Sequence, residues 1–214
     1  MLDCPLVPRP RPHRTMAHHD DYTHFQVLGA NLRNIIAGFG SFGVLGSQIM
    51  IEEKLGTAGP NGMIQVEPEQ WYPLVGNLRS LERIQKEFGE LVVRQTAAAV
   101  PKNAPFPPTV FDIHTALNSV DVAYHMNHAV NGQPMFSPDT GEMREGIGHY
   151  TCRSVEGRKQ FLCECSAPYP CAFDQGLLLA MAQRFEPSAS LAHLEPTRCR
   201  HRGAGPCTYA ISWK

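Results

Sequence analysis

The chain has 214 residues, enough for one large domain, and 43% of them are hydrophobic, so a sizeable core can be buried. The formal net charge is −1, with basic and acidic residues mixed along the sequence, which removes the electrostatic argument for binding nucleic acid or an anionic membrane surface. No apolar run reaches the roughly 18 residues of a membrane span, and the N-terminus lacks the apolar stretch of a secretory signal. We therefore expect a soluble cytoplasmic protein.

The N-terminal half is expected to be mainly helical. Residues 1–20 are rich in Pro and Arg and are expected to form a disordered arm, followed by a single domain over residues 21–214. A short strand is expected at residues 63–67. Apolar residues at helical spacing predict three helices, over residues 74–88, 91–100 and 109–130. Gly89 and the pair Asn131-Gly132 are the expected stop signals.

The C-terminal half is expected to consist of strands around one more helix. Four strands are expected, over residues 148–155, 160–166, 190–194 and 208–213. The first two flank a short turn and form a hairpin. Asp174 is the expected N-cap of a helix over residues 174–185. Helices that precede a mostly antiparallel sheet indicate an α+β fold, with N-terminal helices packed on a C-terminal sheet.

The segment GFGSFG, with Gly38, Gly40 and Gly43, fits the glycine pattern of a dinucleotide-binding turn. In such a unit further parallel strands follow, whereas the pattern over residues 74–130 is helical. We therefore interpret these glycines as places where helices pack closely or a loop turns.

Six of the seven cysteines lie beyond residue 150. An odd count without an export signal argues against a disulfide framework and indicates metal or redox chemistry. Cys199 and Cys207 flank a glycine-containing turn that lets two thiolates face one point, and Cys171 precedes a helix whose N-terminus favours a thiolate. With one more ligand, these three thiolates would hold zinc tetrahedrally. Spacing alone leaves open the alternative that they are ordinary buried or exposed thiols.

Residues 166–213 resemble the C-terminal half of the 4-vinyl reductase, or hydrocarbon-binding, domain family. The shared pattern is a Cys before a Gly-containing helix, then two cysteines seven residues apart and a strand that ends near Trp, here Cys171, Gly176, Cys199, Cys207 and Trp213. The resemblance implies a zinc site in the cysteine-rich half over residues 148–214. It also implies a buried pocket for a small apolar or aromatic ligand between helices and sheet, and a homodimer.

In that family the fourth zinc ligand is often an acidic residue upstream of the first Cys. Here the upstream segment is short and offers Cys163, Glu164 or Cys165. We favour Cys165 because it is nearest to Cys171 in sequence. His193 is its main rival.

One face of the helix expected over residues 109–130 carries four candidate ligand-binding residues, which fall within about 60° of arc: His114, Asp121, His125 and His128. Such a stripe can hold a transition metal, bind haem iron through one His, or contact a ligand hydroxyl. His149 would supply a further ligand if the following hairpin packs beside the helix. The alternative is the solvated face of an ordinary amphipathic helix.

The order of helices, GHYTCRS, hairpin and helix is also similar, more distantly, to haem-based nitric-oxide sensor domains. Those carry a haem-binding His on a helix and a Tyr-x-Ser-x-Arg motif, but here residues 150–154 place Arg one position early and Ser out of place. Our leading hypothesis is a zinc-containing domain that binds a small hydrophobic or aromatic molecule, as sensor or carrier. The alternative is a metalloenzyme or a haem protein that uses the histidine face.

Overall fold

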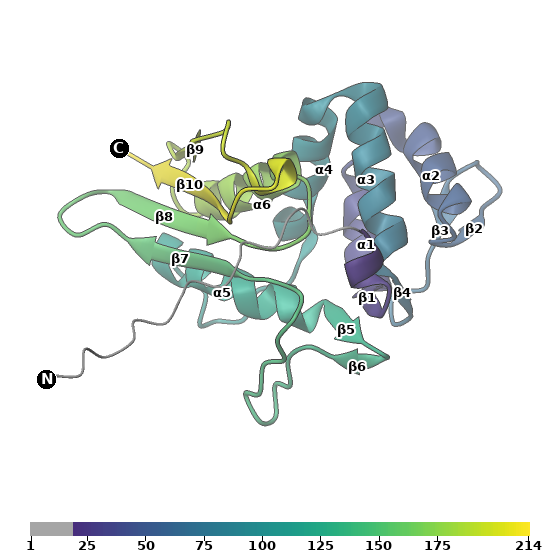
Figure 1. The fold of residues 1–214 in the computed structure, drawn as a ribbon, viewed down its shortest axis with the longest axis horizontal. Coiled ribbons are helices and arrows are strands. Elements are labelled where there is room, and N and C mark those ends of the chain that lie inside the picture. Colours follow the sequence, from purple (N-terminus) through teal and green to yellow (C-terminus); the bar gives the residue numbers. More distant parts are fainter. Residues whose placement is uncertain (1–18) are drawn as a thin grey trace, which may run out of the picture.

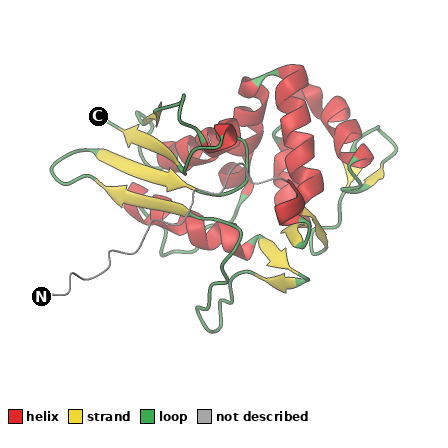
Figure 2. Cartoon of the chain, viewed as in Figure 1, coloured by secondary structure: helices red, strands yellow, loops and turns green. Residues whose placement is uncertain are grey.

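The computed structural model of the chain describes residues 19–214 (Figure 1). The expected arm over residues 1–20 lies outside the described residues, except for its last two positions. Helices α1 to α4 lie on one side of the molecule, and a sheet of strands β7 to β10 lies on the other (Figure 2). The expected α+β class is confirmed.

The first part of the chain is built from η1 (His19–Tyr22), β1 (Phe25–Leu28), α1 (Gly29–Ala37), η2 (Gly40–Phe42), α2 (Gly43–Glu52), β2 (Thr57–Ala58), β3 (Ile64–Gln65), β4 (Trp71–Pro73), α3 (Leu74–Phe88) and α4 (Glu90–Asn103). The second part is built from α5 (Ile113–Met126), β5 (His128–Val130), β6 (Gln133–Pro134), β7 (Tyr150–Ser154), β8 (Gln160–Cys165), α6 (Cys171–Gln183), β9 (Ser190–Leu194), η3 (Arg200–Arg202) and β10 (Cys207–Ser212). All paired strands among the described residues are antiparallel, in the orders β4-β1-β5-β6, β7-β8-β10-β9 and β2-β3.

Helix α3 has the predicted bounds, and Gly89 ends it with a φ of 90°, a conformation that favours glycine. Helix α4 continues one turn beyond its predicted end, with Pro101 inside its last turn. Helix α5 is shorter than predicted. It ends at Met126 because the next residues form β5, which pairs with β1, and Asn131 and Gly132 make the β5–β6 turn with positive φ.

The glycine-rich segment is mostly helical, and the residues directly before it, 32–37, belong to α1 rather than to a strand. A Cβ on Gly38 would lie 2.6 Å from the Cα of Thr96 in α4. A Cβ on Gly176 of α6 would lie 2.2 Å from the carbonyl oxygen of Arg94, also in α4. Helix α4 is therefore in backbone contact with both α1 and α6, and the interpretation of Gly38 as a close-packing position is confirmed.

Alternation along β8 and β10 directs one face of the C-terminal sheet into the core. The buried side chains on that face are Phe161, Cys163, Cys165, Cys207, Tyr209 and Ile211. They pack towards α5 and α6, which lie behind the sheet in Figure 1. Cys152 of β7 and Cys163 of β8 are directly paired and form a disulfide. The expectation that the cysteines form no disulfide is therefore wrong for this pair.

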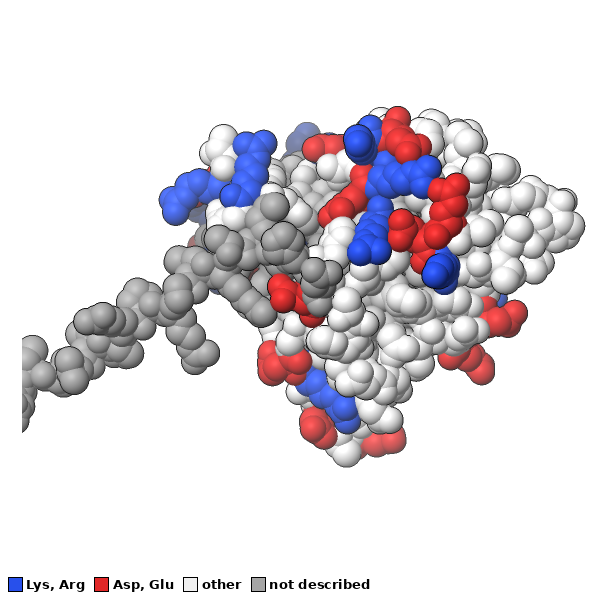
Figure 3. Space-filling view, turned by 45° about the vertical axis from the view of Figure 1, so that its right-hand side comes forward, with Lys and Arg blue, Asp and Glu red and all other residues white. Residues whose placement is uncertain are grey.

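Charged side chains on the exposed face of α3 are of both signs (Figure 3). Arg83 forms ion pairs with Glu52 and Glu87, and Arg79 lies 4.0 Å from Glu53. The charges on this face are thus locally balanced. Among the described helices, no single one is long and apolar enough to cross a membrane, although the bent pair Gly29–Ala37 and Gly40–Glu52 meets the length and composition criteria when taken together.

Candidate metal centre

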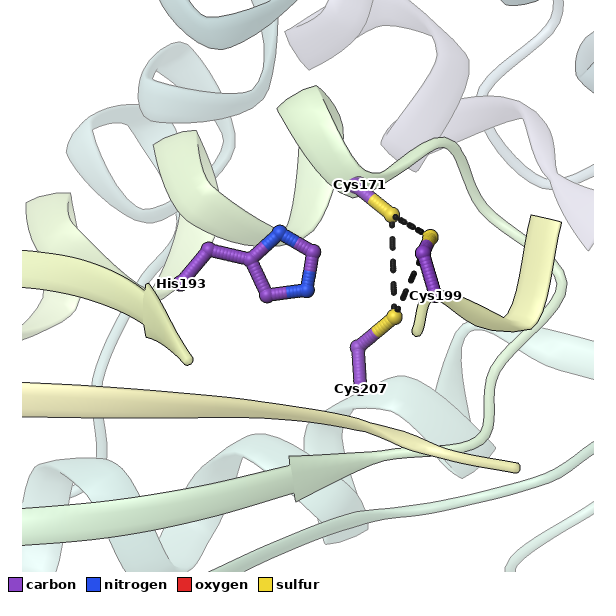
Figure 4. A group of neighbouring side chains, drawn as sticks. All are labelled: Cys171, His193, Cys199 and Cys207. Atoms are coloured by element: carbon purple, nitrogen blue, oxygen red, sulfur yellow. Dashed lines mark hydrogen bonds between the residues drawn. The ribbon is translucent and has the colours of Figure 1, made fainter. Parts of the chain in front are cut away.

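Three cysteine sulfurs meet where the N-terminus of α6 approaches the start of β10 (Figure 4). The Sγ atom of Cys171 lies 3.1 Å from that of Cys199 and 3.7 Å from that of Cys207, and the last two are 3.5 Å apart. In a tetrahedral zinc site with bonds of about 2.3 Å, sulfurs lie about 3.8 Å apart. The three predicted thiols are therefore brought together, at nearly the separation that a shared zinc ion requires.

His193 of β9 is the fourth member of this group. One of its ring nitrogens lies within 4.8 Å of all three sulfurs, and its Nε2 is buried without a hydrogen-bond partner. Figure 4 shows the ring directed towards the sulfurs. Cys165 does not join them: it is the cross-strand partner of Cys207, and its pKa is raised, first by burial and then by the charge of Asp174. Because Cys165 lies outside this group of ligand atoms, the structure favours His193 over our choice of Cys165.

Local backbone structure positions each sulfur. Cys171 is the first residue of α6 and follows Pro170, whose extended backbone precedes the helix. Cys199 begins the turn that contains η3, and Gly203 reverses the chain there with a left-handed φ of 81°. Cys207 is the first residue of β10. The glycine turn proposed from the sequence thus does return the second thiol to the first.

The thiols of Cys207 and Cys171 have pKa values shifted in opposite directions. The pKa of Cys207 is lowered to about 4, first because the Cys171 thiol donates a hydrogen bond to it, and further because the backbone N–H and positive charge of Arg200 favour a thiolate. The same hydrogen bond, followed by burial, raises the pKa of Cys171. One thiolate is therefore favoured before any metal arrives, and metal binding would release the remaining protons.

Arg200 connects this cysteine loop to the core. Its guanidinium donates hydrogen bonds to the backbone oxygen of Cys165, 2.9 Å away, and to that of Tyr169, and forms an ion pair with Asp174. Asp174 is fully buried and also accepts hydrogen bonds from the hydroxyls of Tyr150, at 2.7 Å, and Tyr209, at 3.3 Å. The expectation that Asp174 caps its helix is therefore wrong, because α6 begins three residues earlier.

The predicted histidine face divides into three environments. His114 is exposed, with its ring against Phe161 at a centroid distance of 5.0 Å. His128 lies on β5 rather than on the helix and is buried, and both of its nitrogens are hydrogen-bonded, Nδ1 to the Tyr124 oxygen at 2.6 Å and Nε2 to the Tyr169 hydroxyl at 2.9 Å. It is therefore a satisfied core histidine.

Asp121 and His125 of α5 lie beside His149, which precedes β7, so the hairpin does pack beside the helix. Asp121 accepts a hydrogen bond from His149 Nδ1 at 3.0 Å, and His125 donates from Nδ1 to the Asp121 backbone oxygen at 2.8 Å. The Nε2 of His125 is buried without a partner. Burial lowers the pKa of His149, but its hydrogen bonds to Asp121 and Glu145 outweigh that effect and raise it overall.

A haem held by the sensor motif does not fit these side chains. Tyr150 is buried and bonded to Asp174, whereas Arg153 is exposed, because residues three apart on a strand face opposite sides. His125 has a free buried nitrogen, but its ring centroid lies only 4.9 Å from that of His149. Of the hollows among the described residues, one of about 630 Å³ lies between α1 and β3 and one of about 420 Å³ lies on α3, and neither is lined by a histidine.

Sequence reasoning missed Arg200 and Glu145 as members of these clusters. Arg200 stands between two predicted zinc ligands, yet nothing in its spacing indicates a buried partner 26 residues away. Glu145 lies four residues before His149 in a segment without a helical or strand pattern. His193 was the alternative fourth ligand in the sequence analysis. The strand pairing places it opposite Tyr209, on the same face of the sheet as Cys207.

A scan against models of protein families and a search of curated proteins both find no match. They therefore lend no support to the resemblance to the 4-vinyl reductase family. Solved structures of H-NOX proteins have a similar fold. One, from a study of haem distortion in the H-NOX family, has a TM-score of 0.58 at 12% identity, with 87% of this chain and 94% of that chain covered.

Two further H-NOX structures have similar values. A mutant H-NOX protein from S. oneidensis in the Fe(II) ligation state has a TM-score of 0.56 at 14% identity, over 87% of this chain and 96% of that one. A mutant H-NOX from T. tengcongensis has a TM-score of 0.56 at 12% identity, over 86% and 95%. At 12 to 14% identity, this similarity concerns the fold alone. This chain has the fold of H-NOX domains over nearly its whole described length.

Proposed function

We propose that this chain is a sensor or carrier domain for a small apolar molecule, with a structural zinc ion held by Cys171, His193, Cys199 and Cys207. The observation that carries the proposal is the convergence of three sulfurs, 3.1 to 3.7 Å apart, with a histidine whose buried nitrogen has no partner. A Cys3His set is a common structural zinc site, and it leaves no position open for substrate.

The zinc ion would join three elements: α6 through Cys171, β9 through His193, and the loop into β10 through Cys199 and Cys207. Through Arg200 and Asp174 the same loop reaches the tyrosines of β7 and β10. A change at the metal centre would therefore alter these hydrogen bonds in the core, and a sensor domain needs a connection of this kind.

The ligand site in this proposal is the groove of about 630 Å³ between α1 and β3, whose apolar wall includes Ile36, Met63, Ile64 and Val66. Its volume lies in the range of small-molecule sites, and Arg33, Gln65 and Glu67 add polar groups beside the apolar wall. It replaces the pocket expected between the helices and the sheet, where Leu117 of α5 and Leu178 of α6 are fully buried. A panel of aromatic compounds should raise the melting temperature of the wild-type chain and not of Met63→Glu. A panel without effect on the wild type would refute this ligand site.

Metal analysis tests the zinc site. The wild-type chain should contain one zinc per chain, and Cys199→Ser and His193→Ala should lose it together with part of their stability, because structural zinc contributes folding free energy directly. Cys165→Ser is the matched control, since it removes a buried cysteine outside the group. Loss of zinc in Cys165→Ser with retention in His193→Ala would contradict the proposed ligand set.

The haem-protein alternative is supported by the fold similarity and by the buried, unpaired Nε2 of His125. Adding haem to the purified chain separates the two proposals. We expect no Soret band that depends on His125, because the neighbouring ring of His149 occupies the space beside it. A stoichiometric Soret band that disappears in His125→Ala would establish the alternative.

A further inference from the structure

We propose that Asp121, His125 and His149 form a second metal site, for a divalent first-row transition metal, independent of the thiolate centre. Asp121 and His125 are four residues apart on α5, so their side chains lie on adjacent turns of one face. His149 reaches them from the segment that leads into β7. One ligand atom from each of the three residues lies within 4.8 Å of the others.

The spacing of the donor atoms suits a small cation. The Oδ2 atom of Asp121 and the Nδ1 atom of His149 are 3.0 Å apart. Adjacent ligands of an octahedral ion with bonds of about 2.1 Å are about 3.0 Å apart. A metal ion would therefore displace the proton that these two atoms now share, with release of that proton and a turn of both groups towards the ion.

The surrounding hydrogen bonds orient the ligands in the way that metal sites require. The other carboxylate oxygen of Asp121 is fixed by the backbone N–H of Tyr150 at 2.9 Å. His125 donates its Nδ1–H to a backbone oxygen, so its Nε2 carries a lone pair, and that atom is buried without a partner. A histidine that binds metal usually donates its other nitrogen to a carbonyl or a carboxylate in this manner.

Glu145 holds the far side of the His149 ring, away from the nitrogen that would bind the ion. Its Oε2 atom lies 2.8 Å from His149 Nε2, so a hydrogen bond from Nε2 to this carboxylate orients the ring and leaves Nδ1 to bind the ion. Two imidazoles with one carboxylate form a ligand set typical of iron(II) and related octahedral metals such as manganese and cobalt, whereas three thiolates with one imidazole select zinc. The two centres therefore differ in the metals that they prefer.

Cobalt binding to the full-length chain loaded with one equivalent of zinc tests the site. Isothermal titration near pH 7.5, followed by metal analysis after gel filtration, should show one cobalt ion in addition to zinc. Asp121→Asn and His149→Ala should weaken cobalt binding at least tenfold. His114 lies on the same helix outside the cluster, so His114→Ala should leave cobalt binding unchanged. Cys199→Ser should lose zinc and still bind cobalt, which separates this site from the thiolate centre.

One contrary result is that the wild-type chain binds no cobalt beyond the thiolate centre. The other is that Asp121→Asn and His149→Ala bind cobalt with the same affinity as the wild type. Either result overturns the proposal. Far-ultraviolet circular dichroism of each variant confirms folding before titration. If Asp121→Asn is unfolded, His149→Ala alone decides the outcome, because His149 is partly exposed and lies outside the helix.

Discussion

His128 gives the clearest prediction about stability, because its surroundings admit only the neutral ring. Its Nδ1–H donates to the Tyr124 backbone oxygen, and its Nε2 accepts from the Tyr169 hydroxyl, which itself accepts from the side-chain amide of Asn77 at 3.2 Å. A proton on Nε2 would leave the Tyr169 hydroxyl hydrogen without an acceptor. Burial is the main cause that lowers the pKa of His128 from 6.5 to about 4, and the bond to Tyr124 opposes it only in part.

The magnitude follows from the two pKa values. In the unfolded chain His128 takes up a proton below pH 6.5, whereas in the folded chain it does so only near pH 4. The unfolded state is therefore stabilised as pH falls through this window, and folding free energy is lost. At about 1.4 kcal/mol per pKa unit, the loss approaches about 3 kcal/mol by pH 4. The raised pKa of His149 acts in the opposite direction, with stability lost as pH rises above 6.5.

Urea unfolding of the wild type and of His128→Asn between pH 7 and pH 4 measures the effect. At pH 7 the variant should be less stable by about 1–3 kcal/mol, because the Tyr169 hydroxyl loses its acceptor. Since Asn does not titrate, this difference should shrink by about 3 kcal/mol towards pH 4. Metal loss at low pH affects both proteins and cancels in the difference. A difference that is constant with pH would refute the assignment of a buried neutral His128.

Two further substitutions test the packing around the metal centre. Asp174→Asn should lower the free energy of unfolding by about 3–5 kcal/mol in urea titrations, because it leaves the charge of Arg200 buried and unpaired, whereas Glu52→Gln on the exposed face should change it little. A small effect of Asp174→Asn would contradict the buried ion pair. Gly176→Ala should destabilise by about 1–3 kcal/mol or more in thermal melts, since its Cβ would overlap the Arg94 carbonyl, and an unchanged melting temperature would rule out that close contact.

Local pattern was enough to predict the elements whose stability is local. The apolar stripe of α3, including Leu74, Leu78 and Leu81, is almost fully buried, and Gly89 ends the helix as predicted. The prediction of the C-terminal end of α5 is wrong because the helix ends where the following residues pair with a strand far away in the sequence. Residues after Met126 are compatible with a helix, but hydrogen bonds to β1, about 100 residues earlier, hold them as a strand.

The candidate site shows the same division between local and distant contacts. Cys171, Cys199 and Cys207 could be predicted because tight turns beside a helix and a strand place thiols at a common point. Cys165 was favoured for its proximity in sequence to Cys171, but the β8–β10 register places its thiol beside buried charges. The position of His193 depends on the β9–β10 pairing, which only the folded sheet defines.

X-ray absorption at the zinc edge of the purified chain tests the central claim most directly. The proposal predicts one zinc per chain with three sulfurs at about 2.3 Å and one nitrogen at about 2.0–2.1 Å. In His193→Ala the nitrogen at that distance should be lost or replaced by an oxygen, and in Cys165→Ser the spectrum should be unchanged. A wild-type chain without zinc, or a zinc ion with four sulfurs that becomes three in Cys165→Ser, would contradict the Cys171, His193, Cys199 and Cys207 site.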